Sequence, residues 1–340
     1  MIDTLRLRIP LDLASYASAQ DKCVRFTSAS PDEAGYRKNN YSKTLIIKPH
    51  RAKVRVSLFR EECMFVEFSV PKYWFGHNVL LFNPKDLPLV LDDLKNRLED
   101  AFEIVQLSDY SLWRVQRLDI CYAWKFNSNE EARLALATMK PCELPRKDQV
   151  IYDTTIWYKG NSFSSKFYLK HDEFLQGDYR ELTKWGDIPF AEDIVRMSNG
   201  VLRFEVEMRK GKLDSVFKKD MYPQDIMDTD KIQILLRQFL SDITKTTDTL
   251  LMDLVKVFRL ITSGSTRRQA WELLSFYRVY LSNNPVDREI LKLLPKATFY
   301  AKVKQIKALG VGIYDQDNRL VFAFDIPSIY EVSDAQYPDA

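Results

Sequence analysis

Up to about residue 210, the chain is dominated by segments in which apolar and polar residues alternate with a period of two. Successive side chains of a strand point to opposite faces of a sheet, so this pattern predicts β-strands. The predicted strands cover residues 54–59, 63–70, 115–124, 150–158, 165–170 and 201–209. The first two form a predicted hairpin that turns at residues 60–62.

Two helices interrupt the predicted strands. Residues 85–104 carry leucines at helical spacing, and residues 128–140 open with Ser128 followed three positions later by Glu131, which is a capping box. Strands with inserted helices, rather than a strict alternation of strand and helix, predict an α+β domain on a largely antiparallel β-sheet with flanking helices.

Beyond residue 211 the spacing of apolar residues is helical, at 231–243, 250–261, 267–281 and 296–309. Between the last two, Asn284 can cap a further short helix that has Pro285 in its first turn. Gly310 closes the last of these helices, and residues 313–325 are predicted to form a hairpin. Three helices followed by a hairpin is the order of a winged helix. We therefore expect a catalytic domain at residues 1–212 and a mainly helical domain at 213–340, with a winged-helix-like unit at about 267–325.

Composition narrows the class of protein. The net charge of +3 allows binding to an acidic polymer without demanding it. The four cysteines are scattered and form no C-x-x-C pair, which fits a reducing compartment. The N-terminus lacks a signal-peptide pattern, and no stretch reaches the roughly 18 apolar residues that span a bilayer. We expect a cytoplasmic protein that makes no membrane contact.

Four predicted strands pair an apolar side with a side that carries acids, cations or a tyrosine. A solvated sheet face is the commoner cause of such alternation in any single strand. The chemistry of the set favours function, because carboxylates stand beside Arg117 and Arg203 and next to small residues. The carboxylates predicted to form a hard oxygen site for Mg²⁺ or Mn²⁺ are Glu67, Asp119, Glu205 and Glu207.

Tyr168 is the candidate nucleophile. It lies between Lys166 and Lys170 on the polar side of its predicted strand. Two neighbouring cations predict a local field that favours the phenolate, which a nucleophilic tyrosine with an ordinary pKa near 10 requires. We therefore assign Tyr168, Lys166, Lys170, Arg117 and Arg203 to a predicted catalytic set.

Histidine gives a negative result. The sequence holds only His50, His77 and His171, and none of them form an H-x-H pair, so carboxylates must hold any metal. His77 is predicted to lie in a turn, where a structural role is commoner than metal ligation. The sequence also lacks a Walker A motif, which indicates that the chain does not itself hydrolyse ATP.

The predicted helix at 296–309 is a candidate recognition helix because it is the third of the three helices that precede the predicted hairpin. An ordinary solvated lysine face would give the same pattern. The residues expected to contact DNA are Lys296, Tyr300, Lys304, Gln305 and Lys307.

Short motifs in a fixed order carry a family resemblance. They are Met1-Ile2-Asp3-x-Leu5-x-Leu7-Arg8-x-Pro10, Gly76-His77-Asn78, Arg117-Leu118-Asp119, Tyr168-Leu169-Lys170-His171, Leu202-Arg203-Phe204-Glu205, and Thr298-Phe299-Tyr300 before Leu309-Gly310. With these motifs the chain resembles the replication initiators (gene two products) of filamentous bacteriophages, and more loosely the initiators of rolling-circle plasmids.

The resemblance implies a site-specific endonuclease that nicks one strand of circular double-stranded DNA at its origin. The cut would leave a 5′-phosphotyrosine on Tyr168 and a 3′-hydroxyl that primes synthesis, and the displaced strand would be rejoined after one round. It further implies origin duplex and single-stranded DNA as partners, with host helicase and polymerase, action in the bacterial cytoplasm, and an oligomer on DNA as an option.

Two alternatives stay open at this point. A DNA-binding regulator without chemistry would use the C-terminal unit alone and would leave the Lys-Tyr-Lys face unexplained. A tyrosine recombinase also forms a phosphotyrosine, but it uses arginine and histidine on helices without a metal, whereas Tyr168 lies on a predicted strand. Dependence of nicking on a divalent metal would separate these possibilities.

Overall fold

The structure is a computed structural model, and it describes residues 1–27, 39–60, 63–140, 142, 144–186, 188–244, 261–281 and 285–309. The strands within these residues are β1 (Ile2–Pro10), β2 (Val24–Thr27), β3 (Asn39–Ile47), β4 (Ala52–Arg60), β5 (Cys63–Ser69), β6 (Arg114–Lys125), β7 (Asp148–Ile151), β8 (Thr155–Lys159), β9 (Phe163–Leu169) and β10 (Val201–Arg209). They form one ten-stranded sheet in the order β2-β3-β4-β5-β1-β6-β10-β9-β8-β7. Every pair of neighbours is antiparallel, as the sequence predicts.

The α-helices of the described residues are α1 (Leu13–Asp21), α2 (Val70–Phe75), α3 (Leu87–Phe102), α4 (Asn129–Thr138), α5 (Lys170–Gln176), α6 (Asp178–Lys184), α7 (Ile188–Ser198), α8 (Lys210–Phe217), α9 (Thr229–Thr244), α11 (Arg267–Leu281), α12 (Pro285–Leu293) and α13 (Lys296–Ala308). Short 3₁₀-helices occupy Pro84–Asp86, Tyr110–Leu112 and Pro223–Ile226. Within the described part of the chain, no helix combines the length and the apolar character needed to cross a bilayer.

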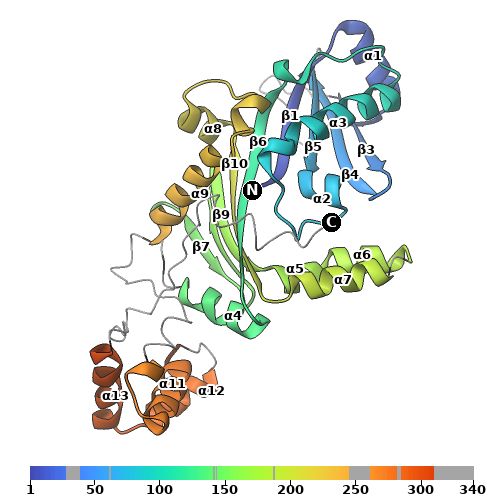
Figure 1. The fold of residues 1–340 in the computed structure, drawn as a ribbon. Coiled ribbons are helices and arrows are strands. Elements are labelled where there is room, and N and C mark those ends of the chain that lie inside the picture. Colours follow the sequence, from blue (N-terminus) through green and yellow to red (C-terminus); the bar gives the residue numbers. More distant parts are fainter. Residues whose placement is uncertain are drawn as a thin grey trace.

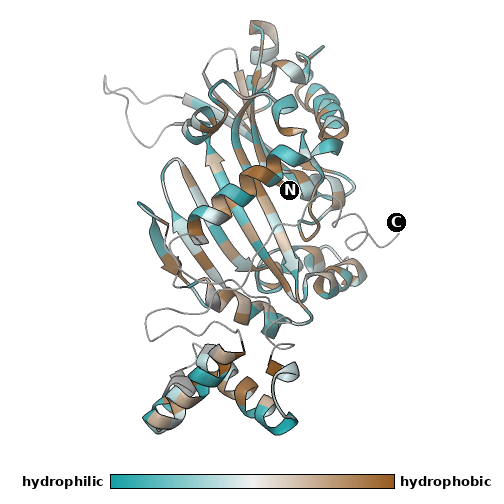
Figure 2. Cartoon of the chain, turned by 60° about the vertical axis from the view of Figure 1, so that its left-hand side comes forward, coloured by the Kyte–Doolittle hydropathy of each residue, from teal (hydrophilic) through white to brown (hydrophobic). Residues whose placement is uncertain are grey.

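One face of the sheet carries the main core. The inward residues of the strands pack with α3, α4 and α9, whose buried residues include Leu94, Leu136 and Leu236. Figure 2 shows the alternation of polar and apolar residues along the strands that makes this possible. Ser128 accepts a hydrogen bond from the backbone N–H of Glu131, which confirms the predicted cap at the start of α4.

Helices α5, α6 and α7 form a second, smaller unit at one end of the sheet (Figure 1). Phe174, Leu182, Ala191 and Ile194 from these helices pack around Val79, which follows α2 in the chain. This small core holds the segment at residues 77–79 and the start of α5 close to the polar side of the sheet. The sequence patterns do not predict these three helices.

Two strand predictions differ from the structure. The predicted strand at 150–158 is a hairpin of β7 and β8, because the chain turns at residues 152–154, where the backbone N–H of Tyr152 donates to the carbonyl of Thr155. The strand predicted to run to Lys170 ends at Leu169. Lys170 is instead the first residue of α5, so strand alternation does not orient its side chain.

The C-terminal helices have a core of their own, which includes Ile261, Leu273, Phe276 and Ile306. Figure 1 shows α11, α12 and α13 beyond α4, away from the centre of the sheet. The hairpin predicted at 313–325 lies outside the described residues, so the winged-helix-like unit remains a prediction. Helix α8 spans the predicted boundary at residue 212 and α9 follows it, yet Leu213 and Leu236 belong to the core of the sheet.

Candidate active site

Three carboxylates from neighbouring central strands meet on the polar face of the sheet. Asp3 comes from β1, Asp119 from β6 and Glu205 from β10, and each offers an oxygen within 4.8 Å of the others. All three side chains are buried. The antiparallel register brings them together. On one side of β6, Asp119 pairs with Thr4, which follows Asp3; on the other side, Glu205 pairs with Cys121, two residues after Asp119. We call these three residues the acid cluster.

Asp3 reaches this cluster through an irregularity in β1. Regular alternation would place Asp3 on the apolar side with Leu5 and Leu7. The pairing of β1 with β6 shifts register between Ile2 and Thr4, so Ile2 lies in the core while Asp3 joins the polar face. Asp3 is part of the motif at residues 1–10, but strand alternation does not predict it as a ligand.

Tyr168 lies beside the acid cluster on β9. Its hydroxyl donates a 2.9 Å hydrogen bond to Oε2 of Glu205, and Nζ of Lys166 lies 2.8 Å from Oε1 of the same carboxylate. The register of β9 with β10 explains both contacts, since Lys166 pairs with Glu205 and Tyr168 with Arg203. Lys166 and Tyr168 therefore share the polar face of their strand, as the sequence predicts.

The pKa of Tyr168 differs from the expectation. Burial raises the pKa of the Tyr168 hydroxyl well above its usual value, and the Glu205 carboxylate raises it further. The charge of Arg203 lowers the pKa of Tyr168, but by less than burial and Glu205 raise it. The prediction that neighbouring lysines favour the phenolate is therefore wrong for this environment. The hydroxyl is buried in its neutral form with Glu205 as a proton acceptor.

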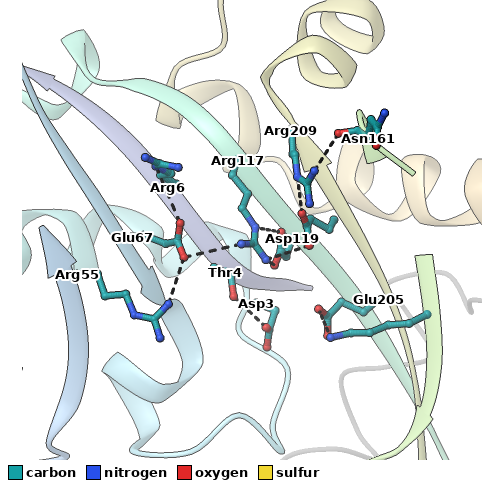
Figure 3. Close-up of polar contacts among 12 residues, drawn as sticks. Asp3, Thr4, Arg6, Arg55, Glu67, Arg117, Asp119, Asn161, Glu205 and Arg209 are labelled. Atoms are coloured by element: carbon teal, nitrogen blue, oxygen red, sulfur yellow. Dashed lines mark hydrogen bonds and ion pairs between the residues drawn. The ribbon is translucent and has the colours of Figure 1, made fainter. Parts of the chain in front are cut away.

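Arg117 connects the acid cluster to the other two predicted metal ligands. Its guanidinium donates to both oxygens of Asp119 at 2.8 and 2.7 Å, and to Glu207 at 3.2 Å. Oε1 of Glu67 lies 3.8 Å from Nη1 of Arg117 and 3.8 Å from Nη1 of Arg55 (Figure 3). Glu67 and Glu207 thus lie in ion pairs beside the acid cluster, rather than among its three ligand oxygens.

Arg203 is completely buried next to the acid cluster. Its Nη2 donates to the backbone carbonyl of Val79 at 2.7 Å, and its Nη1 lies 3.6 Å from Oδ1 of Asp3. Among the described residues, neither Nε nor Nη1 of Arg203 has a hydrogen-bond partner, and Oδ1 of Asp3 also lacks one. A buried acid and a buried cation with unused hydrogen-bonding atoms are costly to leave unsatisfied, which points to a site built for a ligand.

Lys170 and His77 lie around the segment that follows α2. Nζ of Lys170 donates to Oδ1 of Asn78 at 2.7 Å and pairs with Glu173, and burial lowers the pKa of this lysine. Nδ1 of His77 accepts from the backbone N–H of Val79. Burial, followed by the charges of Lys170 and Arg203, lowers the pKa of His77 to about 4. His77 is therefore neutral near pH 7, and its Nδ1 is occupied by the backbone of its own segment.

The carboxylates differ in their protonation. Burial raises the pKa of Asp119 to about 8, although the hydrogen bonds from Arg117 act against this shift. Burial would also raise the pKa of Asp3, but the charge of Arg203, with Lys170 and Lys166, holds it below the usual range. An Asp119 that keeps a proton near neutral pH beside an ionised Asp3 is an arrangement that a cation would relieve.

The acid cluster fits a hard divalent cation. Its ligand atoms are all carboxylate oxygens, which Mg²⁺ and Mn²⁺ prefer, and within the described part of the chain Oδ1 of Asp3 meets no competing hydrogen bond. The chemistry of the donors does not choose between the two metals. Asp3, Asp119 and Glu205 are the residues that would hold the ion.

The predicted recognition helix is α13. Lys296, Tyr300, Lys304 and Gln305 are exposed on it, while Ile306 is buried in the C-terminal core. The side chain of Lys307 lies outside the described residues. This helix therefore presents a partly basic surface to solvent, as the sequence predicts, and its contact with DNA remains a prediction.

Comparison with known families decides the relationship of this chain. Residues 1–222 match the N-terminal part of the phage replication-associated protein known as the gene two protein. The chain belongs to this phage replication-protein family. The match covers every strand of the sheet and therefore all residues of the acid cluster together with Tyr168. Searches of curated proteins and of solved structures give no match. Membership in the gene two protein family establishes a role associated with phage DNA replication.

Proposed function

We propose that this member of the gene two protein family is the rolling-circle initiator that nicks one strand of a circular phage or plasmid DNA at its origin through Tyr168. The observation that carries the proposal is the hydrogen bond from the Tyr168 hydroxyl to Glu205, which is itself a member of the acid cluster. A buried tyrosine in contact with a carboxylate triad is a constellation suited to phosphoryl transfer.

In the proposed reaction, the Tyr168 hydroxyl loses its proton to Oε2 of Glu205, the acceptor already in place at 2.9 Å. The phenolate oxygen forms a bond to the scissile phosphorus, and the bond from phosphorus to the 3′ oxygen breaks. The leaving 3′ oxygen takes up one proton, which balances the one that Glu205 accepts from Tyr168, and becomes the primer hydroxyl, while the 5′ phosphate stays on Tyr168. Attack by a 3′-hydroxyl reverses these bonds and rejoins the strand.

The raised pKa of Tyr168 gives Glu205 a specific task. A tyrosine that stays neutral until the substrate arrives needs a local base, and Glu205 is within hydrogen-bond reach. Lys166 holds the other oxygen of that carboxylate and thereby orients it. When bound at the acid cluster, Mg²⁺ or Mn²⁺ would polarise a phosphate oxygen and neutralise the charge that develops there.

Two partly exposed cations offer the scissile phosphate an approach to these residues. Asp119 and Arg203 are buried, but the side chains of Lys166 and Arg117 at the edge of the cluster are 37% and 28% exposed. Two cations at the rim of a buried acidic site would draw the phosphate toward Tyr168 and offset the repulsion from the carboxylates.

Origin recognition and the DNA and protein partners are proposed from the family and from the exposed residues of α13. Helix α13 would contact the origin duplex through Lys296, Tyr300, Lys304, Gln305 and Lys307. Single-stranded DNA is the product and the rejoining substrate, and host helicase and polymerase would extend the free 3′ end in the bacterial cytoplasm. Several copies could assemble on one origin.

The test is incubation with Mg²⁺ and supercoiled DNA of the phage or plasmid that carries this gene, followed by denaturing electrophoresis. We expect a site-specific nick and a protein–DNA adduct that survives denaturation. Origin binding without a nick or an adduct would instead favour a regulator without chemistry. A nick and adduct that form equally well without divalent metal would favour the recombinase type of mechanism.

A further inference from the structure

A cleft of about 430 Å³ opens on the polar face of the sheet, next to the acid cluster. Its floor comes from β1, β4 and β5, and α6 with Trp185 forms the opposite wall. Two ion pairs join the walls, from Lys53 to Glu181 at 2.6 Å and from Lys72 to Asp178 at 2.7 Å. The volume lies within the range of about 300–1,000 Å³ that is typical of small-ligand sites.

The cleft is continuous with the candidate active site. Thr4 lies in its floor, and its hydroxyl donates to Oδ2 of Asp3 at 3.2 Å. Arg117 also lines the cleft and donates both bonds to Asp119. A ligand in the cleft would therefore lie one side chain away from the acid cluster.

The lining carries more positive than negative charge. Its cations are Arg51, Lys53, Arg55, Lys72 and Arg117, and its acids are Glu67, Asp178 and Glu181, so five positive charges against three leave +2. Glu181 and Asp178 are engaged by the two lysines. Arg55 has a long contact of 3.8 Å to Glu67, and its side chain is 73% exposed. This guanidinium is well placed for a phosphate.

Trp185 supplies an aromatic surface in the same wall. The guanidinium of Arg51 lies 5.0 Å from the centre of its ring, and the residue is 36% exposed. Arg51 has a positive φ of 54°, in the left-handed region that favours glycine or asparagine. Arg51 lies at the turn between β3 and β4, and this turn holds its guanidinium against the Trp185 ring.

We propose that this cleft binds one nucleotide of single-stranded DNA beside the scissile phosphate, with its base stacked on Trp185 and its phosphate on Arg55. The inference rests on the proposed function, which makes single-stranded DNA the product and the rejoining substrate. Aromatic stacking combined with cations along the backbone is the general chemistry of single-strand binding. A duplex keeps its bases paired and stacked internally, so it cannot offer one to Trp185.

The test measures binding of a labelled single-stranded oligonucleotide of about 12 nucleotides by fluorescence anisotropy, a length within the usual site sizes. The full chain carries Tyr168→Phe so that it does not cleave. Trp185→Ala should weaken binding about tenfold, as loss of one stacked base does, and Trp185→Phe should restore most of it. Arg55→Gln should lower the slope of log affinity against log salt by about 0.7.

Two matched controls accompany these variants. Trp74→Ala removes a tryptophan of α2 that is 37% exposed and does not line the cleft. Lys22→Gln breaks an ion pair with Glu103 that lies away from the cleft. Both should bind the oligonucleotide as the Tyr168→Phe parent does. A duplex of the same length should bind equally well to the Trp185→Ala variant and the parent.

Unchanged single-strand affinity in both Trp185→Ala and Arg55→Gln would overturn the inference, even if Tyr168 forms the adduct. An equal loss for single strand and duplex would also overturn it, because stacking would not be the cause. If the cleft variants bind the single strand more weakly while the wild-type chain neither nicks nor forms an adduct, the cleft is a single-strand binding site and the proposed nicking function fails. Arg55 is exposed, so its variant remains informative even if Trp185→Ala unfolds.

Discussion

The Tyr168 hydroxyl donates a 2.9 Å hydrogen bond to Oε2 of Glu205, and the other oxygen of that carboxylate is held by Lys166 at 2.8 Å. This contact links the candidate nucleophile on β9 to the acid cluster through one residue of β10. Because Glu205 belongs to both, a change at this carboxylate should disturb proton transfer and metal binding together. Substitutions of Asp3 or Asp119 should weaken metal binding without removing the proton acceptor of Tyr168.

The acid cluster predicts which carboxylates bind the metal. Asp3→Asn and Asp119→Asn should each weaken Mn²⁺ binding by more than about tenfold and slow nicking by about 10²-fold, because a ligand oxygen becomes neutral. Glu67→Gln should change either quantity by less than about fivefold, since Glu67 lies in partly exposed ion pairs. Isothermal titration with Mn²⁺ and a supercoiled-DNA nicking assay measure the two quantities.

Glu67→Gln is the matched control, as it also removes one negative charge from the same sheet face. If Glu67→Gln abolishes Mn²⁺ binding while Asp3→Asn leaves it unchanged, the metal lies nearer to the ion pairs of Arg117 than to the acid cluster. Normal nicking by all three variants would make these acids structural partners of the arginines.

The raised pKa of Asp119 predicts proton release on metal binding. Below its pKa of about 8 this carboxyl keeps a proton that the metal must displace. The affinity for Mn²⁺ should therefore rise about tenfold per pH unit up to about pH 8 and then level off. At pH 7, titration in buffers of different ionisation enthalpy should show release of about one proton.

The Tyr168→Phe background removes the tyrosine from this titration. A Mn²⁺ affinity that stays constant between pH 6 and 8 would contradict the assignment of a protonated Asp119 to the metal site.

Helix α13 predicts how the protein distinguishes duplex from single strand. Lys304→Ala combined with Lys307→Ala should weaken origin-duplex binding and reduce its salt slope by about 0.9 for each lost phosphate contact. Cleavage of a short single-stranded oligonucleotide should stay unchanged, because that substrate needs only the site on the sheet. Filter binding over a salt series and an oligonucleotide cleavage assay test the two parts. An unchanged slope would place α13 against protein rather than DNA.

The packing of α9 predicts where the chain can be truncated without unfolding the catalytic domain. A fragment of residues 1–244 should fold and cleave a single-stranded oligonucleotide. A fragment that ends at residue 215 lacks Ile232, Leu236 and Ile243, which are fully buried against the sheet. Each such side chain contributes about 1.5–3 kcal/mol, and the whole stability of a domain is about 5–15 kcal/mol, so the shorter fragment should unfold.

Thermal unfolding followed by circular dichroism distinguishes the two fragments. A cooperative transition in the shorter fragment would show that α9 is dispensable for the sheet. A folded fragment of residues 1–244 that cannot cleave the oligonucleotide would show that the C-terminal helices complete the site.

The sequence predicts strands best where both faces alternate without interruption. The bounds of β10 agree with the prediction because Arg203, Glu205 and Glu207 alternate with apolar residues along its length. Alternation on its own cannot show where a strand ends, so it assigns Lys170 to β9 rather than α5. The hairpin of β7 and β8 resembles one strand in sequence because its turn lacks glycine and proline.

The candidate site shows the same limit. Asp119, Glu205 and Tyr168 can be predicted because they share the polar side of regular strands. Asp3 cannot, because a register shift in β1 turns it to the opposite face from the one that alternation gives. The predicted pKa of Tyr168 is wrong because burial, which depends on the tertiary fold, outweighs the neighbouring lysines. Neither the register shift in β1 nor the burial of Tyr168 can be predicted from the residues next to them in the sequence.

Tyr168→Phe isolates the proposed nucleophile. The variant loses one hydroxyl and keeps the ring, so it should unfold within a few degrees of the wild type and bind DNA normally. Nicking and adduct formation should both disappear. Tyr179→Phe, a partly buried tyrosine of α6 that packs against Phe174, is the matched control and should nick normally. Loss of nicking in both variants would show that neither result is specific to the nucleophile.

The most direct test of the central claim is to map the covalent adduct. The wild-type chain is incubated with Mg²⁺ and supercoiled origin DNA, the adduct is digested with protease and nuclease, and the modified peptide is sequenced by mass spectrometry. We expect a single nucleotide-bearing tyrosine, Tyr168, with its phosphate at the 5′ end of the cut strand. A modified peptide centred on another tyrosine, such as Tyr158 or Tyr179, would contradict the account.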